Sequence, residues 1–276
     1  MNPLQAVILG VVQGLTEFLP VSSSGHLVLF QRLFDLHEPE LVFNVSVHMG
    51  TLSAVVLFFH REIRGLLTAL WRLTIGLIRR NAPAGTLLAD PEIRLAALIG
   101  VGSIPTAFIG LMFHRAADRI FSSTVLVGCM LVVTGTLLWA TSRRQRDGRT
   151  AARFTFPTAL VIGVAQGMAI LPGISRSGAT IATGLFLGLD GPTAARYSFL
   201  LSVPAIVGAQ LVSLSDGATG APAIGVILAG ALSAAVVGYA ALSFLVFIVH
   251  QGRMHLFAPY CWILGGVILI LNLLSF

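Results

Sequence analysis

The sequence predicts an all-α polytopic membrane protein with six full spans and two re-entrant helix–loop–helix hairpins, arranged as an inverted-topology repeat. Three observations predict this class. Hydrophobic residues make up 56% of the chain and charged residues 10%, and the mean hydropathy of +0.91 lies far above that of soluble domains. Several apolar runs are long enough to cross a bilayer, and a polar motif near the N-terminus recurs near the middle of the chain.

About 20 apolar residues cross the hydrocarbon core as a helix. Six segments qualify: 41–60, 93–113, 123–142, 193–214, 222–249 and 256–275. Four shorter apolar segments form two pairs, 4–18 with 25–35 and 157–170 with 178–189, and Pro, Gly and Ser residues interrupt each pair. Each pair is expected to enter and leave the membrane on one side. The chain is then one integral membrane domain, 1–276, whose halves, 1–153 and 154–276, each hold a hairpin and three spans.

The positions of the arginines orient these segments. Two loops are rich in arginine and should be cytoplasmic, namely 61–80 with Arg61, Arg64, Arg72, Arg79 and Arg80, and 143–153 with Arg143, Arg144, Arg146, Arg149 and Arg153. The loop 214–221 contains Asp216 and no base, which suits the outer face, whereas Arg115 and Arg119 in 114–122 run against this orientation. The hairpins then enter from opposite faces and meet near the bilayer midplane. Residues 61–80 are expected to form an amphipathic helix on the cytoplasmic surface.

Other features have plain structural interpretations. The net charge of +6 comes from arginines at the ends of apolar runs, so topology explains it and nucleic acid is not an expected partner. Cys129 and Cys261 lie alone in apolar segments and are predicted to pack in the core, without a disulfide or a thiolate metal site. The N-terminus has no basic n-region and is not expected to be a cleaved signal peptide. Gly230, Ala234 and Gly238 recur every four residues, which predicts close helix packing.

The polar repeat marks the candidate site. Residues 6–25 and 159–178 align without a gap, and the shared positions include Gln13 with Gln166 and Ser22 with Ser175. In the first copy, Glu17 is a carboxylate at membrane depth, where an unpaired charge is costly. Gln13 lies on the same helix face. Ser22, Ser23, Ser24 and His26 follow at the start of the next half-helix, where capping by serine is the alternative interpretation.

In the second copy, Ser175, Arg176 and Ser177 lie in a membrane-depth loop after Pro172 and Gly173, with Thr180 one turn further. A guanidinium binds phosphate oxygens by two hydrogen bonds at once, and a helix N-terminus adds N–H groups and a positive dipole end. The alternative is an internal salt bridge between Arg176 and Glu17.

These residue types match the needs of phosphoryl transfer. Arg176 would be the anion clamp, His26 the acid or base, and Ser23, Ser24 or a water molecule the nucleophile. A cage of protein ligands for a metal is not expected, but a divalent cation could bridge Glu17 and substrate phosphates. His48 could approach the hairpin or bond a neighbouring helix. His60, His114, His250 and His255 fall at span ends, where the membrane interface explains them.

QGLTEFLPVSSSGH at 13–26 and LPGISRSGAT at 171–180 resemble the two signature motifs of the bacterial undecaprenyl-diphosphate phosphatase family, also called the bacitracin-resistance protein family. The resemblance implies hydrolysis of undecaprenyl diphosphate to the monophosphate and inorganic phosphate at the outer side of the cytoplasmic membrane. This reaction recycles the lipid carrier for cell-wall synthesis and confers bacitracin resistance. Serine or water is left open as the nucleophile.

The resemblance also implies roles for single residues. The catalytic set is Ser23, His26, Glu17 and Arg176, with Glu17 as a magnesium or proton partner. The substrate-binding positions that the motifs imply are Gln13, Gly173, Ser175, Ser177 and Thr180, and Ser22 and Ser24, beside Ser23 in the first motif, complete the predicted substrate-binding set. Gln13 is the variant residue at a position where the family has Glu or Gln. The main alternative function is a transporter or flippase for polyprenyl phosphate, since inverted repeats with broken helices are typical of carriers. Membrane lipids are expected partners, and a homo-oligomer is left open.

Overall fold

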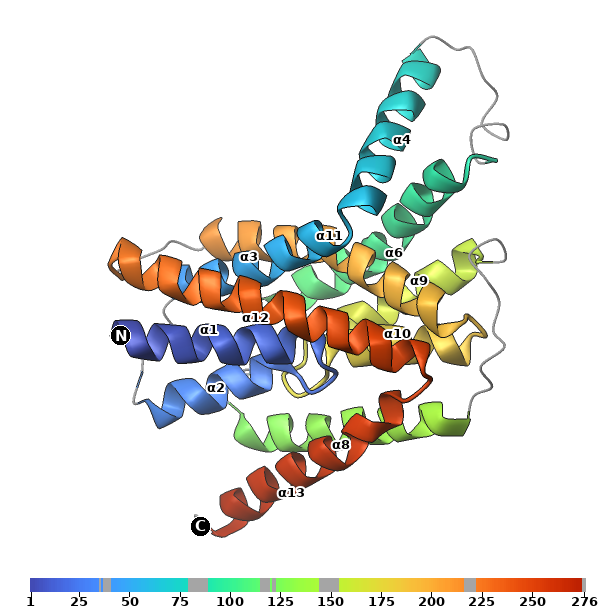
Figure 1. The fold of residues 1–276 in the computed structure, drawn as a ribbon. Helices are drawn as coiled ribbons and strands as arrows, with labels where there is room; N and C mark the ends of the chain where they lie inside the picture. Colours follow the sequence, from blue (N-terminus) through green and yellow to red (C-terminus); the bar gives the residue numbers. More distant parts are fainter. Residues whose placement is uncertain are drawn as a thin grey trace.

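The computed structural model describes residues 1–34, 36, 41–78, 89–114, 120, 123–143, 154–215 and 222–274. Within these ranges every regular element is helical (Figure 1). The elements are α1 (Pro3–Phe18), α2 (Ser23–Leu33), α3 (Leu41–Phe58), α4 (His60–Ile78), α6 (Pro91–His114), α8 (Thr124–Ala140), η1 (Thr141–Arg143), α9 (Phe156–Met168), α10 (Arg176–Phe186), α11 (Gly191–Ser215), α12 (Ile224–His250), η3 (Met254–Phe257) and α13 (Ala258–Leu274).

The six predicted spans are confirmed. Six helical segments in the described ranges are long and apolar enough to cross a membrane: Leu41–Phe58, Pro91–Phe113, Thr124–Arg143, Gly191–Ser215, Ile224–His250 and Met254–Leu274. Their ends differ from the predicted ends by only a few residues. The chain is therefore a multi-pass membrane protein with an all-α fold.

The four shorter helices form the two expected hairpins, α1 with α2 and α9 with α10. In Figure 1 the first hairpin lies in the left half of the bundle and the second in the right half, and their connecting turns meet in the middle. The first helix of each hairpin starts with a side-chain cap, since Asn2 and Thr155 accept hydrogen bonds from backbone N–H groups one turn on. This placement is compatible with an inverted repeat, which remains a prediction.

The second helix of each hairpin starts two residues earlier than the sequence predicts. The carbonyl of Ser22 accepts the backbone N–H of His26 at 3.3 Å, so α2 begins at Ser23. Ser175 is the N-cap of α10, and its Oγ accepts the N–H of Gly178 at 3.1 Å. Arg176 therefore lies in the first turn of a helix, not in the middle of a loop.

Glycines let the hairpins pack directly against long helices. A Cβ on Gly10 of α1 would lie 2.3 Å from the carbonyl oxygen of Gly230 on α12, and one on Gly14 would lie 2.8 Å from that of Ala234. The predicted packing role of the small residues in α12 is thus confirmed. In the other half, a Cβ on Gly163 of α9 would lie 2.1 Å from the carbonyl oxygen of Gly102 on α6. Both hairpins are held at backbone contact distance.

One prediction about the cysteines is wrong. Cys261 is buried as expected, but Cys129 is exposed on the outer face of α8. An apolar thiol on a membrane-facing surface has no desolvation cost to avoid, so the apolar sequence around Cys129 did not require a core position.

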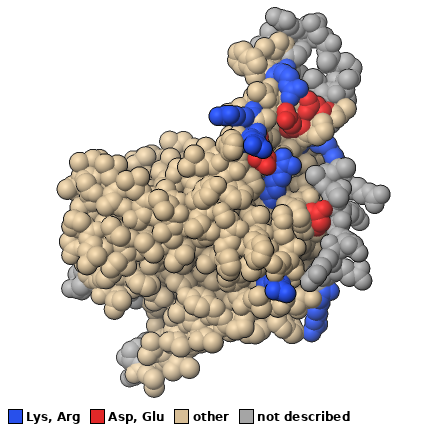
Figure 2. Space-filling view, viewed as in Figure 1, with Lys and Arg blue, Asp and Glu red and all other residues tan. Residues whose placement is uncertain are grey.

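Charged side chains gather toward the end of the molecule from which α4 extends, whereas the rest of the face in Figure 2 is uncharged. The predicted amphipathic segment 61–80 is helical through Ile78, with exposed Arg64 and Trp71. Arg72 pairs with Asp90 at 3.0 Å and with Glu92 at 2.8 Å, which ties α4 to the start of α6. The other predicted loop residues lie outside the described residues: Arg79, Arg80, Arg115, Arg119, Arg144, Arg146, Arg149, Arg153 and Asp216.

Candidate active site

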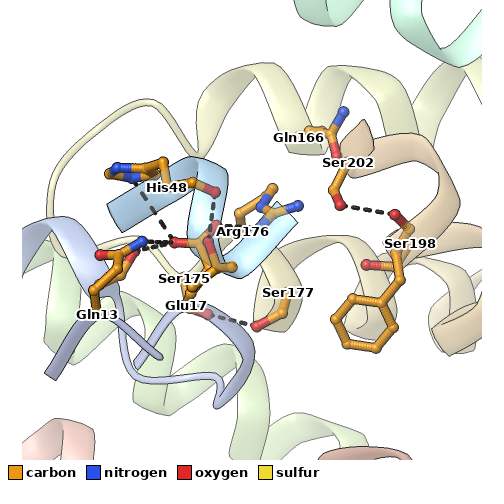
Figure 3. A network of polar contacts seen from close by, with 12 residues as sticks. Gln13, Glu17, His48, Gln166, Ser175, Arg176, Ser177, Ser198 and Ser202 are labelled. Carbon is orange, nitrogen blue, oxygen red and sulfur yellow. Dashed lines mark hydrogen bonds and ion pairs between the residues drawn. The ribbon is translucent and has the colours of Figure 1, made fainter. Parts of the chain in front are cut away.

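Glu17 is the centre of a buried polar cluster at the end of α1 (Figure 3). Its Oε2 accepts a hydrogen bond from Ser23 Oγ at 2.6 Å and another from Gln13 Nε2 at 3.0 Å. Its Oε1 accepts a hydrogen bond from Nη2 of Arg176, in the second hairpin. The carboxylate therefore joins both halves of the molecule.

The ion pair between Arg176 and Glu17, which the sequence left as an alternative, is present. Pairing offsets the cost of burying either charge. A guanidinium has five N–H donors in a planar fork, so pairing through one nitrogen leaves donors for an anion. The Arg176 side chain is 17% exposed, against 6% for Glu17. Structural pairing and anion binding are therefore compatible at this residue.

The turns of the two hairpins also contact each other directly. Ser22 Oγ accepts the backbone N–H of Gly173 at 3.0 Å and lies 3.3 Å from Ser24 Oγ. Ser22 has a φ of 71°, an unfavourable backbone conformation for a residue other than glycine. The second hairpin has a matching hydroxyl pair, Ser175 Oγ and Ser177 Oγ, 3.1 Å apart. The predicted serines thus shape the contact between the hairpins.

A threonine on α8 holds the turn of the second hairpin. Thr134 Oγ1 donates to the carbonyl of Gly173 at 2.8 Å and accepts the N–H of Ser175 at 3.2 Å. Gly173 has a φ of 100°, and a Cβ there would lie 2.4 Å from the carbonyl oxygen of Val127. Thr134 was not predicted from the sequence, because one threonine in an apolar span carries no distinctive pattern.

Both imidazole nitrogens of His26 contact groups other than Ser23. Its Nδ1 lies 2.7 Å from the carbonyl oxygen of Ser22, and its Nε2 lies 2.7 Å from the hydroxyl of Tyr260 on α13. Ser23 instead donates to Glu17. The hydrogen-bond partner of the candidate nucleophile is therefore a carboxylate.

His48 approaches the cluster from α3, one of the two alternatives that the sequence left open. Its Nε2 lies 4.0 Å from Oε2 of Glu17, and its Nδ1 lies 2.8 Å from the carbonyl oxygen of Asn44 (Figure 3). His60 and His250 are exposed at helix ends, as predicted, and His255 lies in η3.

Thr180 contacts the backbone of Arg176 and does not contact Glu17. It is fully buried, donates to the carbonyl of Arg176 at 2.7 Å, and lies 2.5 Å from the hydroxyl of Ser198 on α11. Thr180 thus braces the first turn of α10 against a full span. Substrate contact by Thr180 remains a prediction that the sequence motif supports, and Ser198 is a partner that the motif did not reveal.

The donor set for a metal is small. Among the described residues there is no group of three or more His, Cys, Asp and Glu side chains that could hold an ion. Among those residues, the buried amide oxygen Oε1 of Gln13 has no hydrogen-bond partner. Glu17 and this oxygen are ligand types that Mg²⁺ prefers, and Mg²⁺ commonly binds one or two protein ligands together with substrate phosphates. The residues therefore fit a cation held jointly with a phosphorylated ligand.

The fold and the site define a polytopic membrane protein whose acidic, basic and hydroxyl side chains converge where two hairpins meet. The family model described as "Bacitracin resistance protein BacA" matches residues 6–267. The chain belongs to this family.

Curated relatives resemble the chain over almost its full length. A protein of Desulforapulum autotrophicum named "Undecaprenyl-diphosphatase" is 54% identical over 271 residues, which cover 98% of each chain. One of Desulfosudis oleivorans with the same name is 54% identical over 270 residues, again 98% of each chain. Another of the same name, from Methanosphaera stadtmanae, is 42% identical over 278 residues and 99% of each chain.

Proposed function

We propose that this protein is an undecaprenyl-diphosphate phosphatase, which hydrolyses the lipid diphosphate to undecaprenyl phosphate and inorganic phosphate. The names of the relatives supply the substrate. The observation on the chain itself that carries the proposal is the junction of Glu17, Arg176 and Ser23, in which one carboxylate contacts both a guanidinium and a hydroxyl. An anion clamp and a polarised hydroxyl are the protein groups that phosphoryl transfer needs.

Arg176 would bind the terminal phosphoryl group. Its guanidinium can contact two phosphate oxygens at once, and α2 and α10 both start at this junction. The N-terminal N–H groups of a helix favour an anion. Developing negative charge on the phosphoryl oxygens would therefore be stabilised by groups that are already in position.

The reaction breaks the bond between the bridging oxygen and the terminal phosphorus. The attacking oxygen belongs either to a water molecule or to Ser23, in which case water then hydrolyses the phosphoserine. In both routes the lipid phosphate leaves with the bridging oxygen, and one water is consumed in total. Glu17 would accept a hydrogen bond from the attacking group, as it does from Ser23 at 2.6 Å. The resemblance of the first motif to the family implies that His26 transfers the proton.

Mg²⁺ is part of the proposal, with Glu17 and Oε1 of Gln13 as its protein ligands. A bound Mg²⁺ would neutralise charge on the diphosphate. Chelation of divalent cations with EDTA is expected to stop phosphate release, and readdition of Mg²⁺ is expected to restore it. Full activity in excess EDTA would contradict a role for Mg²⁺ in the reaction.

We also propose that the protein works in the bacterial cytoplasmic membrane with its site open to the outer face. The gathering of charged side chains at one end of the bundle supports a cytoplasmic position for that end (Figure 2). The polyprenyl tail would stay in the lipid while its diphosphate reaches the hairpins. This activity would return the lipid carrier to cell-wall synthesis and protect cells from bacitracin.

The test is phosphate release from undecaprenyl diphosphate by the purified protein in detergent with Mg²⁺. Wild type should release phosphate, Arg176→Ala and Ser23→Ala should lose most of the rate, and Arg61→Ala, which changes an exposed arginine on α4, should keep it. No release by folded wild type would contradict the proposal and favour the flippase, whose assay would be transfer of polyprenyl phosphate across vesicles.

A further inference from the structure

His26 is held from outside its own hairpin by the last span. Tyr260 lies 234 residues further along the chain, and its hydroxyl is 2.7 Å from Nε2 of His26. The two rings are also stacked, with centroids 5.8 Å apart and planes 10° apart. Two different interactions therefore fix the position of the imidazole.

The partners of the imidazole decide which nitrogen can accept a proton. The carbonyl of Ser22 can only accept a hydrogen bond, so Nδ1 of His26 carries a hydrogen and donates it at 2.7 Å. In the neutral ring, Nε2 then has the only lone pair, and the Tyr260 hydroxyl donates to it. Once Nε2 is protonated, the same hydroxyl can rotate and accept. Tyr260 can therefore serve His26 in both protonation states.

The start of α13 contacts the first hairpin at a second point. Cys261 Sγ, next in sequence to Tyr260, lies 3.5 Å from the carbonyl oxygen of Pro20 in the turn between α1 and α2. Tyr260 itself is 47% exposed, whereas His26 is 5% exposed. The tyrosine therefore stands on the membrane-facing surface of α13 with its hydroxyl directed at a buried histidine.

We propose that Tyr260 is a positioning residue for the phosphatase reaction, acting through His26. It fixes the tautomer and the direction of the imidazole, and its hydroxyl rotates off the lone pair of Nε2 when that nitrogen takes a proton. This inference rests on the proposed function for its catalytic part only, because the contact between Tyr260 and His26 can be tested without any substrate.

The experiment combines chemical modification with kinetics on the purified full-length protein. Diethylpyrocarbonate modifies unprotonated imidazole nitrogens, and mass spectrometry gives the modification rate of each histidine. Tyr260→Phe keeps the stacked ring and removes the hydroxyl. The matched control is Tyr239→Phe on α12, which is 45% exposed and packs its ring against Phe58. His48 serves as the internal reference in every sample.

In Tyr260→Phe, His26 should be modified several-fold faster while His48 keeps its rate, and Tyr239→Phe should change neither. The kcat for phosphate release should fall by about 10- to 100-fold with KM almost unchanged, as expected when a reacting group loses its alignment. Tyr260→Leu, which also removes the ring, should enlarge both effects.

An unchanged modification rate of His26 in both Tyr260 variants would contradict the contact between Tyr260 and His26. Faster modification with wild-type kcat would overturn the catalytic part. Should wild type release no phosphate at all, the proposed function fails, while the modification rates still decide whether Tyr260 covers His26.

Discussion

Gly10→Ala offers a stringent test of how the first hairpin is positioned, because the change lies far from the reacting groups. The new Cβ would be 2.3 Å from the carbonyl oxygen of Gly230 and 2.9 Å from Cβ of Ser233. An ordinary contact needs about 3.4 Å, so α1 and α12 must separate locally by about 1.1 Å. Overpacking of this kind costs about 1–3 kcal/mol. The gain in helix propensity from glycine to alanine, about 1 kcal/mol at most, offsets only the lower end of this cost.

Glu17 lies seven residues after Gly10, or about 10 Å along the same face of α1. A shift of about 1 Å there would move the carboxylate relative to Arg176, which belongs to the other hairpin. A misplacement of that size can lower a rate by about 100-fold. We therefore expect Gly10→Ala to release phosphate about 100-fold more slowly and to melt at a lower temperature than wild type in the same detergent.

The control is Gly100→Ala in α6, where no described atom beyond its chain neighbours and the adjacent backbone of α6 lies within 4 Å of the added Cβ. This variant should keep the wild-type rate and should melt no lower than wild type, because alanine favours the helix more than glycine does. A rate for Gly10→Ala within twofold of wild type would refute the reasoning, since it would mean that the site does not depend on backbone contact between α1 and α12.

Three further substitutions test single contacts of the site. Arg176→Lys keeps the positive charge beside Glu17 but loses the planar guanidinium. Phosphate release should therefore fall by about 100- to 1,000-fold with little loss of thermal stability. A wild-type rate would argue against bidentate binding of phosphate by Arg176. Thr134→Val removes both hydrogen bonds to the second hairpin. It should lower the free energy of unfolding by about 1–3 kcal/mol, measured as a lower melting temperature. An unchanged melting temperature would contradict a stabilising role for Thr134. His48→Gln should lower the rate of phosphate release by less than about fivefold, because the partly exposed pair of His48 and Glu17 at 4.0 Å contributes about 1 kcal/mol or less. A 100-fold loss would instead make His48 essential.

The membrane spans and hairpins were predictable because hydropathy and length act locally. A run of apolar residues either reaches the thickness of the hydrocarbon core or does not, which is why the six spans match to within a few residues. The start of α10 was missed by two residues, because an arginine at membrane depth suggested a loop, whereas Ser175 caps a helix that begins at Arg176.

The candidate site was only partly predictable. The motifs supplied Glu17, Ser23 and Arg176, and their charges and polar groups were expected to converge. The pairings were not predictable, because they depend on how separate helices dock. Tyr260 reaches His26 across 234 residues of sequence, and nothing in the pattern around a tyrosine in an apolar span indicates that partner. For the same reason, the sequence did not reveal that Ser23 donates a hydrogen bond to Glu17.

The most direct test of the central claim is the rate of phosphate release from undecaprenyl diphosphate by wild type, Glu17→Gln and Glu92→Gln. Glu17 is the carboxylate that joins the hairpins, whereas Glu92 forms an exposed pair with Arg72 at the start of α6. The account predicts release by wild type and Glu92→Gln and loss of nearly all release in Glu17→Gln. Equal rates in all three folded proteins would contradict a phosphatase site at the junction of the two hairpins.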